Sequence, residues 1–305
     1  MNITPVKISV TLTDLNLQIL DSLELRINNK IAKEELIAQI NEGVHRITRK
    51  VARERILGIG ISSPGQIDAK EGKVIVSHSI TNWRDVPLAS VIEQEWKIPA
   101  CVEHNVKAMA MRELWVGTGN PERNFIVMKI GYGIGAGIVI DRNVYRGATG
   151  NSGELGHTKI QQDGPLCTCG SRGCYESLAD LSALEERMKK RLLDFQGNYE
   201  DIFQLAKEGN KEATEAIEVT ASYLARGIVN LIHLLNLPLI LIGGEVAPYW
   251  PQLAPFVLRT LDELALETLR KGADLRLINH ENDAEAQGAA AIVFDREFRI
   301  PVQKS

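Results

Sequence analysis

The sequence is poor in aromatic residues and has no excess of positive charge. Phe, Trp and Tyr make up 5% of its 305 residues, and 35 Lys and Arg stand against 39 Asp and Glu, which gives a net charge of −4. A protein that attracts a polyanion over its whole surface needs a positive field, and this composition does not supply one. If the protein works on DNA, the contacts are therefore not made by this chain as a whole.

A signal peptide and a membrane-spanning segment are also missing from the sequence. Met1 is followed by Asn2-Ile-Thr-Pro5, and not by a basic stretch and then an apolar one. The most apolar window, Gly227–Gly244, contains two Asn, one His and one Pro, so it does not offer the ~20 apolar residues that cross a bilayer. We expect a cytoplasmic protein without membrane insertion.

The remaining composition is that of a folded protein. The chain is 44% hydrophobic and 24% charged, which is too apolar for a disordered chain. Its length suggests two domains of about 150 residues each.

The first sixty residues predict the order strand, strand, helix, strand. Polar and apolar residues alternate over 6–12, a second strand is expected over 18–27, and apolar residues at helical spacing predict a helix over 33–53. A buried strand over 56–61 then leads to Ser62-Ser-Pro-Gly65. This order places the Pro-Gly loop at the carboxyl end of a strand, where open α/β sheets bind ligands.

A second α/β unit is expected later in the chain. A strand over 125–130 passes through a turn of glycines at 131–137 into another strand, and glycines let a backbone approach a ligand closely. A helix over 215–235 is followed by a strand over 239–242 that ends in Gly243-Gly244.

One histidine and three cysteines have the spacing of a metal site. His157, Cys167, Cys169 and Cys174 follow the pattern H-x9-C-x-C-x4-C, with glycines between them that let the chain turn back on itself. Three thiolates and one imidazole make a tetrahedral set for zinc, and four protein ligands leave no open position, so the zinc is expected to be structural. The alternative is a glycine-rich loop with three reduced cysteines, which is disfavoured because Cys is rare elsewhere in the chain. Cys101, in an apolar run, is interpreted as a buried hydrophobic residue.

Two carboxylates flank this cluster. Glu154 lies three residues before His157, and Glu176 lies two residues after Cys174. If a helix begins near Gly153, Glu154 and His157 share one face of it. A metal loop would then hold both carboxylates as hydrogen-bond acceptors for a polyhydroxylated ligand, although Glu154 could equally be a carboxylate that interacts with a helix dipole.

The same residues resemble the signature of a known family. Gly153-Glu-Leu-Gly-His157, the loop Cys167–Cys174 and Tyr175-Glu176 resemble the ROK family, named for repressors, open reading frames and sugar kinases. Shorter matches extend the resemblance over most of the chain, at Ser63-Pro-Gly65, Gly72, Asn82-Trp83, Val86-Pro-Leu88 and Gly288-Ala-Ala290. The resemblance implies an α/β fold of two actin-like (ribonuclease H-like) domains with a sugar cleft between them. The expected domains are residues 1–117 with 288–305, and residues 118–287 with the zinc loop.

The resemblance also implies a sugar site, whose expected residues are Gly65, His104, Asn105, Glu154, His157 and Glu176. In the kinases of the family an Asp takes the proton from the sugar hydroxyl, and the matching segment here, Glu103–Lys107, has Asn105 at that position. An amide can hydrogen-bond a hydroxyl but cannot accept its proton. No catalytic residue is therefore expected, and His104 is similar to the sugar-responsive repressor branch.

The nucleotide motifs of the kinases are also altered. The segment that resembles their first phosphate turn, Asn2–Val6, has no glycine, and Pro5 removes a backbone donor. Tyr132 stands between Gly131 and Gly133, where the kinases have a small hydroxyl residue, while Gly243 and Gly244 persist. We interpret these four glycines as a vestigial nucleotide site, and ATP with magnesium is not expected as a cofactor.

The resemblance therefore favours the sugar-binding, non-catalytic effector domain of a ROK transcriptional repressor, expected to form a homodimer or a dimer of dimers. By the same resemblance Met1 falls within the first strand of the family's domain, and no winged helix-turn-helix is present, so the chain is expected to be a piece of a longer regulator or a protein without its DNA reader. The first alternative is an ATP-dependent sugar kinase of the glucokinase or N-acetylhexosamine kinase type, with Glu103 or His104 as the base. The second is an adaptor for a transport-system protein. The sequence does not indicate which sugar would bind.

Overall fold

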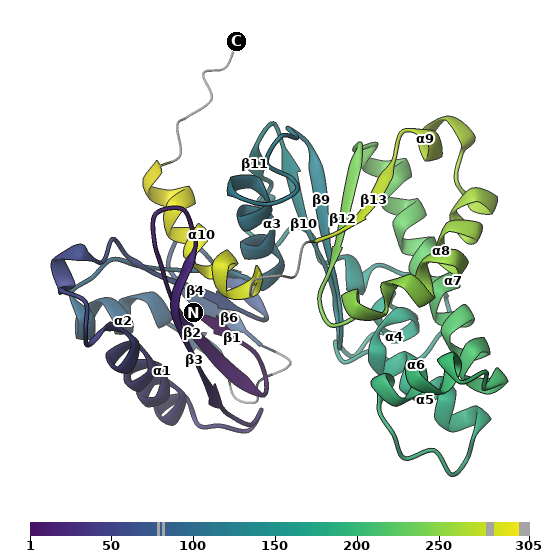
Figure 1. Cartoon of the computed structure of the whole chain (residues 1–305), viewed down its shortest axis with the longest axis horizontal. Helices are drawn as coiled ribbons and strands as arrows, with labels where there is room; N and C mark the ends of the chain where they lie inside the picture. Colours follow the sequence, from purple (N-terminus) through teal and green to yellow (C-terminus); the bar gives the residue numbers. More distant parts are fainter. Residues whose placement is uncertain (78–79, 81–82, 279–283, 299–305) are drawn as a thin grey trace. The chain divides into compact units, whose positions relative to one another are not determined.

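The computed structural model describes residues 1–77, 80, 83–278 and 284–298, so Asn82 of the family resemblance lies outside the described residues. The chain divides into two compact units (Figure 1). The first unit comprises Met1–Arg123, Gly137–Ser152 and the described part of Asn279–Ser305, and the second comprises Asn124–Ala136 and Gly153–Ile278. Residues 137–152 thus pack with the first unit, although the sequence placed them in the second domain.

The first unit contains a five-stranded sheet in the order β3-β2-β1-β4-β8. Strands β1 to β3 are antiparallel neighbours, whereas β1, β4 and β8 are parallel. The strands are β1 (Asn2–Ile3), β2 (Lys7–Thr13), β3 (Ile19–Arg26), β4 (Ile59–Ser63) and β8 (Ala100–His104). A small second sheet contains β5 (Gln66–Asp68), β6 (Lys73–Val76) and β7 (Arg84–Val86).

Helices α1 (Lys33–Thr48), α2 (Leu88–Trp96), α3 (Asn105–Trp115) and α10 (Ala284–Phe298) complete the first unit, with the 3₁₀ turn η1 (Arg53–Arg55). The apolar stripe of α1 ends at Ile47, and the helix accordingly ends before the expected Arg53. Strand β4 begins three residues later than expected, because Ile56 closes the η1 turn with a bond to the Arg53 carbonyl.

Helix α10 approaches β4 and α3 closely at two glycines. A Cβ at Gly60 would overlap the backbone of Ala289, and a Cβ at Gly288 would lie 2.9 Å from the Ala108 carbonyl. Packing therefore accounts for Gly288, one of the positions that match the family.

The other five-stranded sheet has the order β11-β10-β9-β12-β13. Its strands are β9 (Phe125–Ile130), β10 (Ile134–Ile140), β11 (Asn143–Val144), β12 (Leu239–Gly243) and β13 (Asp274–Leu277). Strand β10 begins at Ile134, so the glycine turn is shorter than the expected 131–137. Gly137 lies within this strand, and the position requires glycine because a Cβ there would meet the Val106 carbonyl of α3 at 2.6 Å. This close contact with α3 is one reason why residues 137–152 belong to the first unit.

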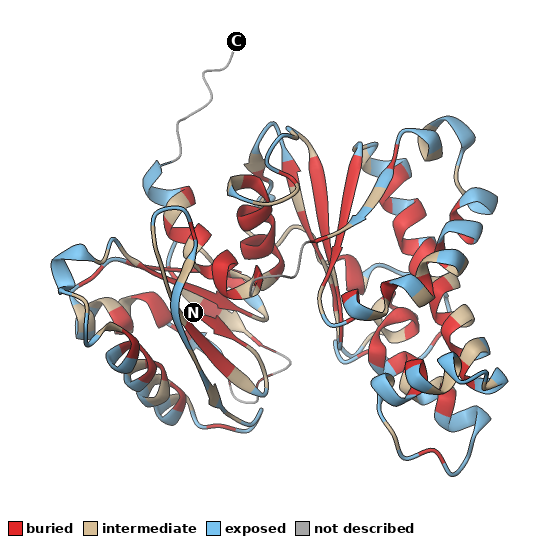
Figure 2. Ribbon diagram, in the orientation of Figure 1, coloured by how far each residue is buried: buried red, intermediate tan, exposed pale blue. Residues whose placement is uncertain are grey.

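The helices of the second unit are α4 (Glu176–Ala179), α5 (Leu181–Arg191), α6 (Tyr199–Lys207), α7 (Lys211–Leu235), α8 (Trp250–Leu264) and α9 (Glu267–Lys271), with the 3₁₀ turns η2 (Leu155–His157) and η3 (Ala247–Tyr249). Helices α7 and α8 lie side by side (Figure 1). Helix α7 begins four residues earlier than predicted, because the Asn210 side chain caps it by accepting a bond from Ala213 N–H. The buried residues line the strands and the inner faces of the helices (Figure 2).

None of the described helices combines the length and apolarity needed to cross a membrane.

Candidate metal and ligand site

The four expected metal ligands lie in one tightly folded loop between β10 and α4. Two isolated antiparallel bridges, Lys159 with Cys174 and Leu166 with Arg172, fold the loop on itself. Gly173 has φ +69°, and a Cβ there would overlap the Gln161 carbonyl, so this position requires glycine. The fold of the loop brings His157 and the three cysteines together.

The geometry of the cluster fits a tetrahedral metal. One donor atom from each of His157, Cys167, Cys169 and Cys174 lies within 4.8 Å of the others. The Cys169 and Cys174 sulfurs are 3.7 Å apart, and the Cys167 sulfur is 3.7 Å from His157 Nδ1. With zinc bonds of about 2.3 Å to sulfur and about 2.0 Å to nitrogen, a tetrahedral site has sulfur–sulfur distances of about 3.8 Å and sulfur–nitrogen distances of about 3.5 Å. All four cysteines of the chain are free, so no disulfide competes for these thiols.

A lysine that the sequence analysis did not single out accompanies the cluster. Lys159 Nζ lies 3.0 Å from the Cys174 sulfur and donates to Ser171 Oγ at 2.6 Å. Three thiolates, one neutral imidazole and a divalent ion carry a net charge of −1, which an ammonium group at this distance offsets. The pairing of Lys159 with Cys174 across an antiparallel bridge explains the contact, and the spacing of the ligands alone does not reveal it.

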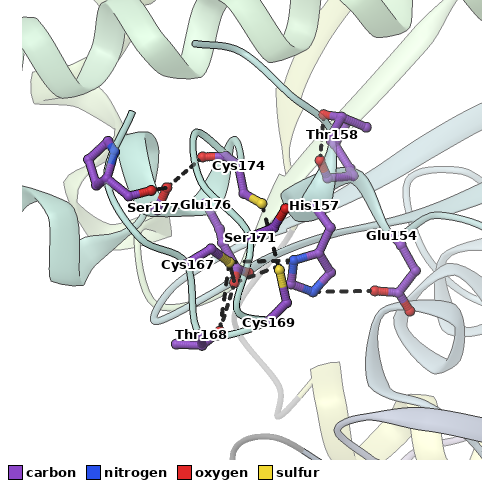
Figure 3. A network of polar contacts seen from close by, with 12 residues as sticks. Glu154, His157, Thr158, Cys167, Thr168, Cys169, Ser171, Cys174, Glu176 and Ser177 are labelled. Atoms are coloured by element: carbon purple, nitrogen blue, oxygen red, sulfur yellow. Dashed lines mark hydrogen bonds and ion pairs between the residues drawn. The ribbon is translucent and has the colours of Figure 1, made fainter. Parts of the chain in front are cut away.

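The two carboxylates lie on either side of the His157 ring (Figure 3). Glu154 Oε2 is 3.9 Å from Nε2, and Glu176 Oε1 is 3.7 Å from Nδ1. Glu176 Oε1 also accepts bonds from Cys167 and Thr168, both at 3.1 Å. Nδ1 of His157 faces the Cys167 sulfur, so Nε2 is directed toward Glu154. Glu154 and Glu176 offer carboxylate oxygens that can accept hydrogen bonds from hydroxyl groups.

Burial raises the pKa of the Cys167 thiol to about 12, and the neighbouring Glu176 carboxylate acts in the same direction.

The residues Leu155–His157 form a 3₁₀ turn, and the Glu154 side chain does not cap it. The α-helix considered for Gly153–His157 therefore does not form.

A buried acid connects α4 to α5 beside this site. Asp180 is 7% exposed and caps α5 by accepting a bond from Ala183 N–H at 2.8 Å. Burial raises its pKa from 3.8 to about 7, helped by Glu176 and Glu185 and opposed by the Ala183 bond and Arg187. The folded state thus binds the Asp180 proton more tightly than the unfolded state does, so this acid favours folding at low pH and loses that effect as the pH rises through 7.

We expect Asp180→Asn to remove this pH dependence. Between about pH 4.5 and 6.5, the free energy of unfolding of the wild type relative to Asp180→Asn should fall by up to about 1.4 kcal/mol per pH unit. Urea unfolding from pH 4 to 8 measures the difference. Asp194→Asn, in the exposed turn after α5, controls for the loss of a carboxylate, and parallel stability curves for wild type and Asp180→Asn would contradict the prediction.

The other expected sugar residues belong to the first unit. Strands β4 and β8 are parallel neighbours in which Ser63 pairs with His104, so Gly65 and Asn105 follow the carboxyl ends of adjacent strands. Gly65 has φ +103°, a backbone conformation that favours glycine. Asn105 begins α3, and its Oδ1 accepts a bond from Val106 N–H at 2.7 Å.

A buried ion network, which the sequence analysis did not predict, underlies His104 and Asn105. Glu103 is 1% exposed and accepts a bond from Arg146 Nε at 3.0 Å, and Arg146 also reaches Asp295 of α10 at 3.3 Å. Lys107, 2% exposed, donates to the Gly150 carbonyl. These bonds join β8, α3 and α10 to the loop that leads to Glu154. The bonded residues are too far apart in the sequence for the sequence pattern to reveal the pairs.

The glycines expected to form a vestigial nucleotide site follow two neighbouring strands. Strands β9 and β12 are parallel neighbours, so Gly131, after β9, and Gly243 and Gly244, at the end of β12, lie at the same edge of the sheet. The Gly131 N–H donates to the Gly133 carbonyl at 3.0 Å, and a Cβ at Gly131 would overlap the Glu245 carboxylate. Gly244 has φ +90°, and a Cβ there would lie 2.5 Å from the Ile130 carbonyl, so backbone packing is sufficient to require it.

Tyr132 at the tip of this turn is held by contacts from two helices. Its hydroxyl donates to Glu185 at 2.9 Å, and its ring packs edge-on against Tyr199 at 5.8 Å. Burial raises the Tyr132 pKa, and the bond to Glu185 raises it further. The Tyr132 ring and the carboxylates of Glu185 and Glu245 thus surround the glycine turn.

Comparisons with known proteins all point to one family. The model of the ROK family matches residues 2–296. The chain is 32% identical over 229 residues to the xylose repressor of Caldicellulosiruptor bescii, covering 70% of this chain and 57% of that protein. It is 30% identical over 261 residues to the glucokinase of Halalkalibacterium halodurans, covering 81% of this chain and 78% of the enzyme.

A solved structure is also similar over almost the whole chain. The ROK family transcriptional regulator described as a homologue of Escherichia coli MLC superposes with a TM-score of 0.86 at 26% identity, covering 96% of this chain and 76% of that one. This chain therefore spans only part of the two regulators in the comparison.

Proposed function

The chain belongs to the ROK family, and from this we propose that it is the sugar-binding, non-catalytic effector part of a ROK transcriptional regulator. Its two α/β units have the actin-like fold of that family. Sequence identity does not choose between regulator and kinase, because the xylose repressor and the glucokinase are almost equally similar. The choice depends on the residues of this chain.

The observation that carries the proposal is the environment of Asn105. An amide at the position of the family's base cannot accept a proton, and the kinase alternative would need Glu103 or His104 to replace it. Glu103 is 1% exposed and bonded to Arg146 and to His104 N–H. A carboxylate held in this way is a poor proton acceptor for a substrate hydroxyl.

The closed glycine turn also supports the absence of catalysis. A phosphate would need free backbone N–H groups at this turn, but the Gly131 N–H is bonded within the turn. The Glu245 carboxylate lies against Gly131, and like charges repel at such short range. Both features disfavour binding of a nucleotide phosphate at this turn.

In this proposal zinc is the metal of the Cys167–Cys174 loop, and its role is structural. The sugar contacts are Glu154, His157 and Glu176 of the second unit, with Gly65, His104 and Asn105 of the first. The metal loop orients Glu154 and Glu176, which accept bonds from sugar hydroxyls. Specific recognition of operator DNA is not assigned to this chain.

We expect calorimetry against D-xylose, D-glucose and N-acetyl-D-glucosamine to find a sugar that binds without ATP. Glu154→Ala and Glu176→Ala should each weaken its affinity about 10- to 150-fold, because each removes a charge-assisted acceptor of about 1.5–3 kcal/mol. Asn105→Asp should change the affinity only a few-fold, since the two side chains have nearly the same shape.

Glu186→Ala, which removes an exposed carboxylate of α5, is the control. The sugar assignment is wrong if no sugar of the panel binds, or if the variants at Glu154 and Glu176 bind as well as the control.

A further inference from the structure

The end of α1 and the turn that follows it carry a local excess of positive charge. Five of the eleven residues from 45 to 55 are Arg or Lys and one is Glu, whereas the whole chain has a net charge of −4. We call this group the α1 basic patch; its residues are Arg46, Arg49, Lys50, Arg53 and Arg55, and all five are exposed.

The patch is unusual in having almost no internal partners. In the part of the chain that the structure describes, no ion pair or side-chain hydrogen bond involves Arg46, Arg49, Lys50 or Arg55, and Arg53 contacts only the Glu95 carbonyl, at 3.4 Å. Most other arginines are paired with carboxylates, namely Arg112, Arg123, Arg146, Arg191, Arg259, Arg270, Arg276 and Arg296. The patch therefore keeps its charges available to an external anion.

The backbone turns twice over this short segment. Helix α1 ends at Thr48, and successive turns close with bonds from Val51 N–H to the Thr48 carbonyl and from Arg55 N–H to the Ala52 carbonyl. Arg46 lies in the last turn of α1, Arg49 and Lys50 follow its end, and Arg53 and Arg55 belong to the 3₁₀ turn η1, so all five cations lie within ten residues of a tightly turning chain. The nearby carboxylates are Glu54 within the segment, Glu42 on α1, and Glu95, whose carbonyl contacts Arg53.

The composition of the patch distinguishes between two kinds of anionic partner. Stable protein interfaces have an apolar centre from which water is excluded, and among these eleven residues no apolar side chain is exposed beyond the single methyl of Ala52. Leu57, 41% exposed, lies outside the segment. Clustered Arg and Lys without an apolar centre match the contacts that proteins make with DNA phosphates.

We propose that the α1 basic patch is a sequence-independent contact for the phosphate backbone of duplex DNA. The proposal builds on the assignment of the chain as part of a DNA-associated regulator, but it uses a surface separate from the sugar residues. The patch adds non-specific affinity and reads no base sequence.

The test is fluorescence anisotropy of a labelled 20-base-pair duplex of arbitrary sequence, from 25 to 200 mM KCl. About four phosphate contacts give a slope near −4 for log affinity against log salt, so affinity should fall about 100-fold or more between 50 and 200 mM. We expect binding at 25 mM KCl and none that is measurable at physiological salt.

The variant R46Q/R49Q/K50Q should lose at least ten-fold in affinity at 25 mM KCl. The matched control K190Q/K207Q/K211Q removes three exposed cations from the second unit and should bind like the wild type. No binding at 25 mM, or an equal loss in both variants, would overturn the proposal. A poly-L-glutamate of equal charge that competes as well as DNA would also overturn it, by indicating an acidic protein as the partner.

Sugar calorimetry on the same variants separates this proposal from the proposed function. R46Q/R49Q/K50Q should bind sugar as the wild type does, because none of its residues belongs to the sugar set. Loss of DNA binding with sugar binding intact therefore tests the patch alone.

Discussion

Removing the metal from the His157–Cys174 cluster is expected to destabilise the second unit and abolish sugar binding together. Zinc binding supplies about 10–16 kcal/mol to isolated zinc peptides. Here the surrounding core remains, so we expect a smaller loss of about 4 kcal/mol, which lowers the Tm by about 8–16 °C. Sugar binding should fail because Glu176 contacts Cys167 and Thr168 of the loop.

The experiment combines metal analysis, thermal unfolding and calorimetry before and after chelation. We expect one zinc per chain in the wild type and none in C167S/C174S. Cys101→Ser is the matched control, because it removes the buried thiol outside the cluster and should keep the zinc. Protein without zinc as isolated, or chelated protein that binds sugar unchanged, would contradict the assignment.

Phosphoryl transfer from ATP to the bound sugar is expected to be absent. The loss of a general base alone lowers rates by about 10²- to 10⁴-fold, and sugar kinases of ordinary efficiency turn over at about 1–100 per second. A coupled assay with magnesium and ATP should detect no turnover above about 0.01 per second. Turnover in the ordinary kinase range would refute the regulator assignment.

Asn105→Asp restores the carboxylate but is expected not to restore activity. The Glu245 carboxylate still lies against Gly131, and the Gly131 N–H is still bonded within the turn, so no phosphoryl group is positioned for attack. Titration with a fluorescent ATP analogue should show increased affinity in Glu245→Gly and no change in Asn105→Asp. Appreciable kinase activity of Asn105→Asp would mean that the nucleotide site is intact.

Local patterns in the sequence predicted most elements and the residues of the His/Cys cluster. Strand β2 and helix α1 were predicted from the spacing of apolar residues, because the periods of a strand and of a helix are properties of consecutive residues. The four expected metal ligands lie within eighteen residues, and their spacing alone indicated a Cys₃His cluster. The ends of elements were less accurate: α1 stops at Thr48 with its apolar stripe, and β10 includes glycines that looked like turn residues.

Contacts between distant residues were decided only by the tertiary structure. The assignment of residues 137–152 to the first unit depends on the contact of Gly137 with α3, and the Glu103–Arg146–Asp295 network joins residues up to 192 positions apart in the numbering. Lys159 beside Cys174 and Glu245 over Gly131 likewise depend on strand pairing and loop closure.

The sequence by itself thus determined the family, the α/β character and the residues of the His/Cys cluster, because these depend on residue types at short spacings. Only the tertiary structure decided which charges are neutralised and which remain available. Glu103 is bonded to a buried arginine, whereas the cations of the α1 basic patch have almost no partner. Ion pairing depends on distances of a few ångströms between side chains from different elements, and a linear sequence does not contain those distances.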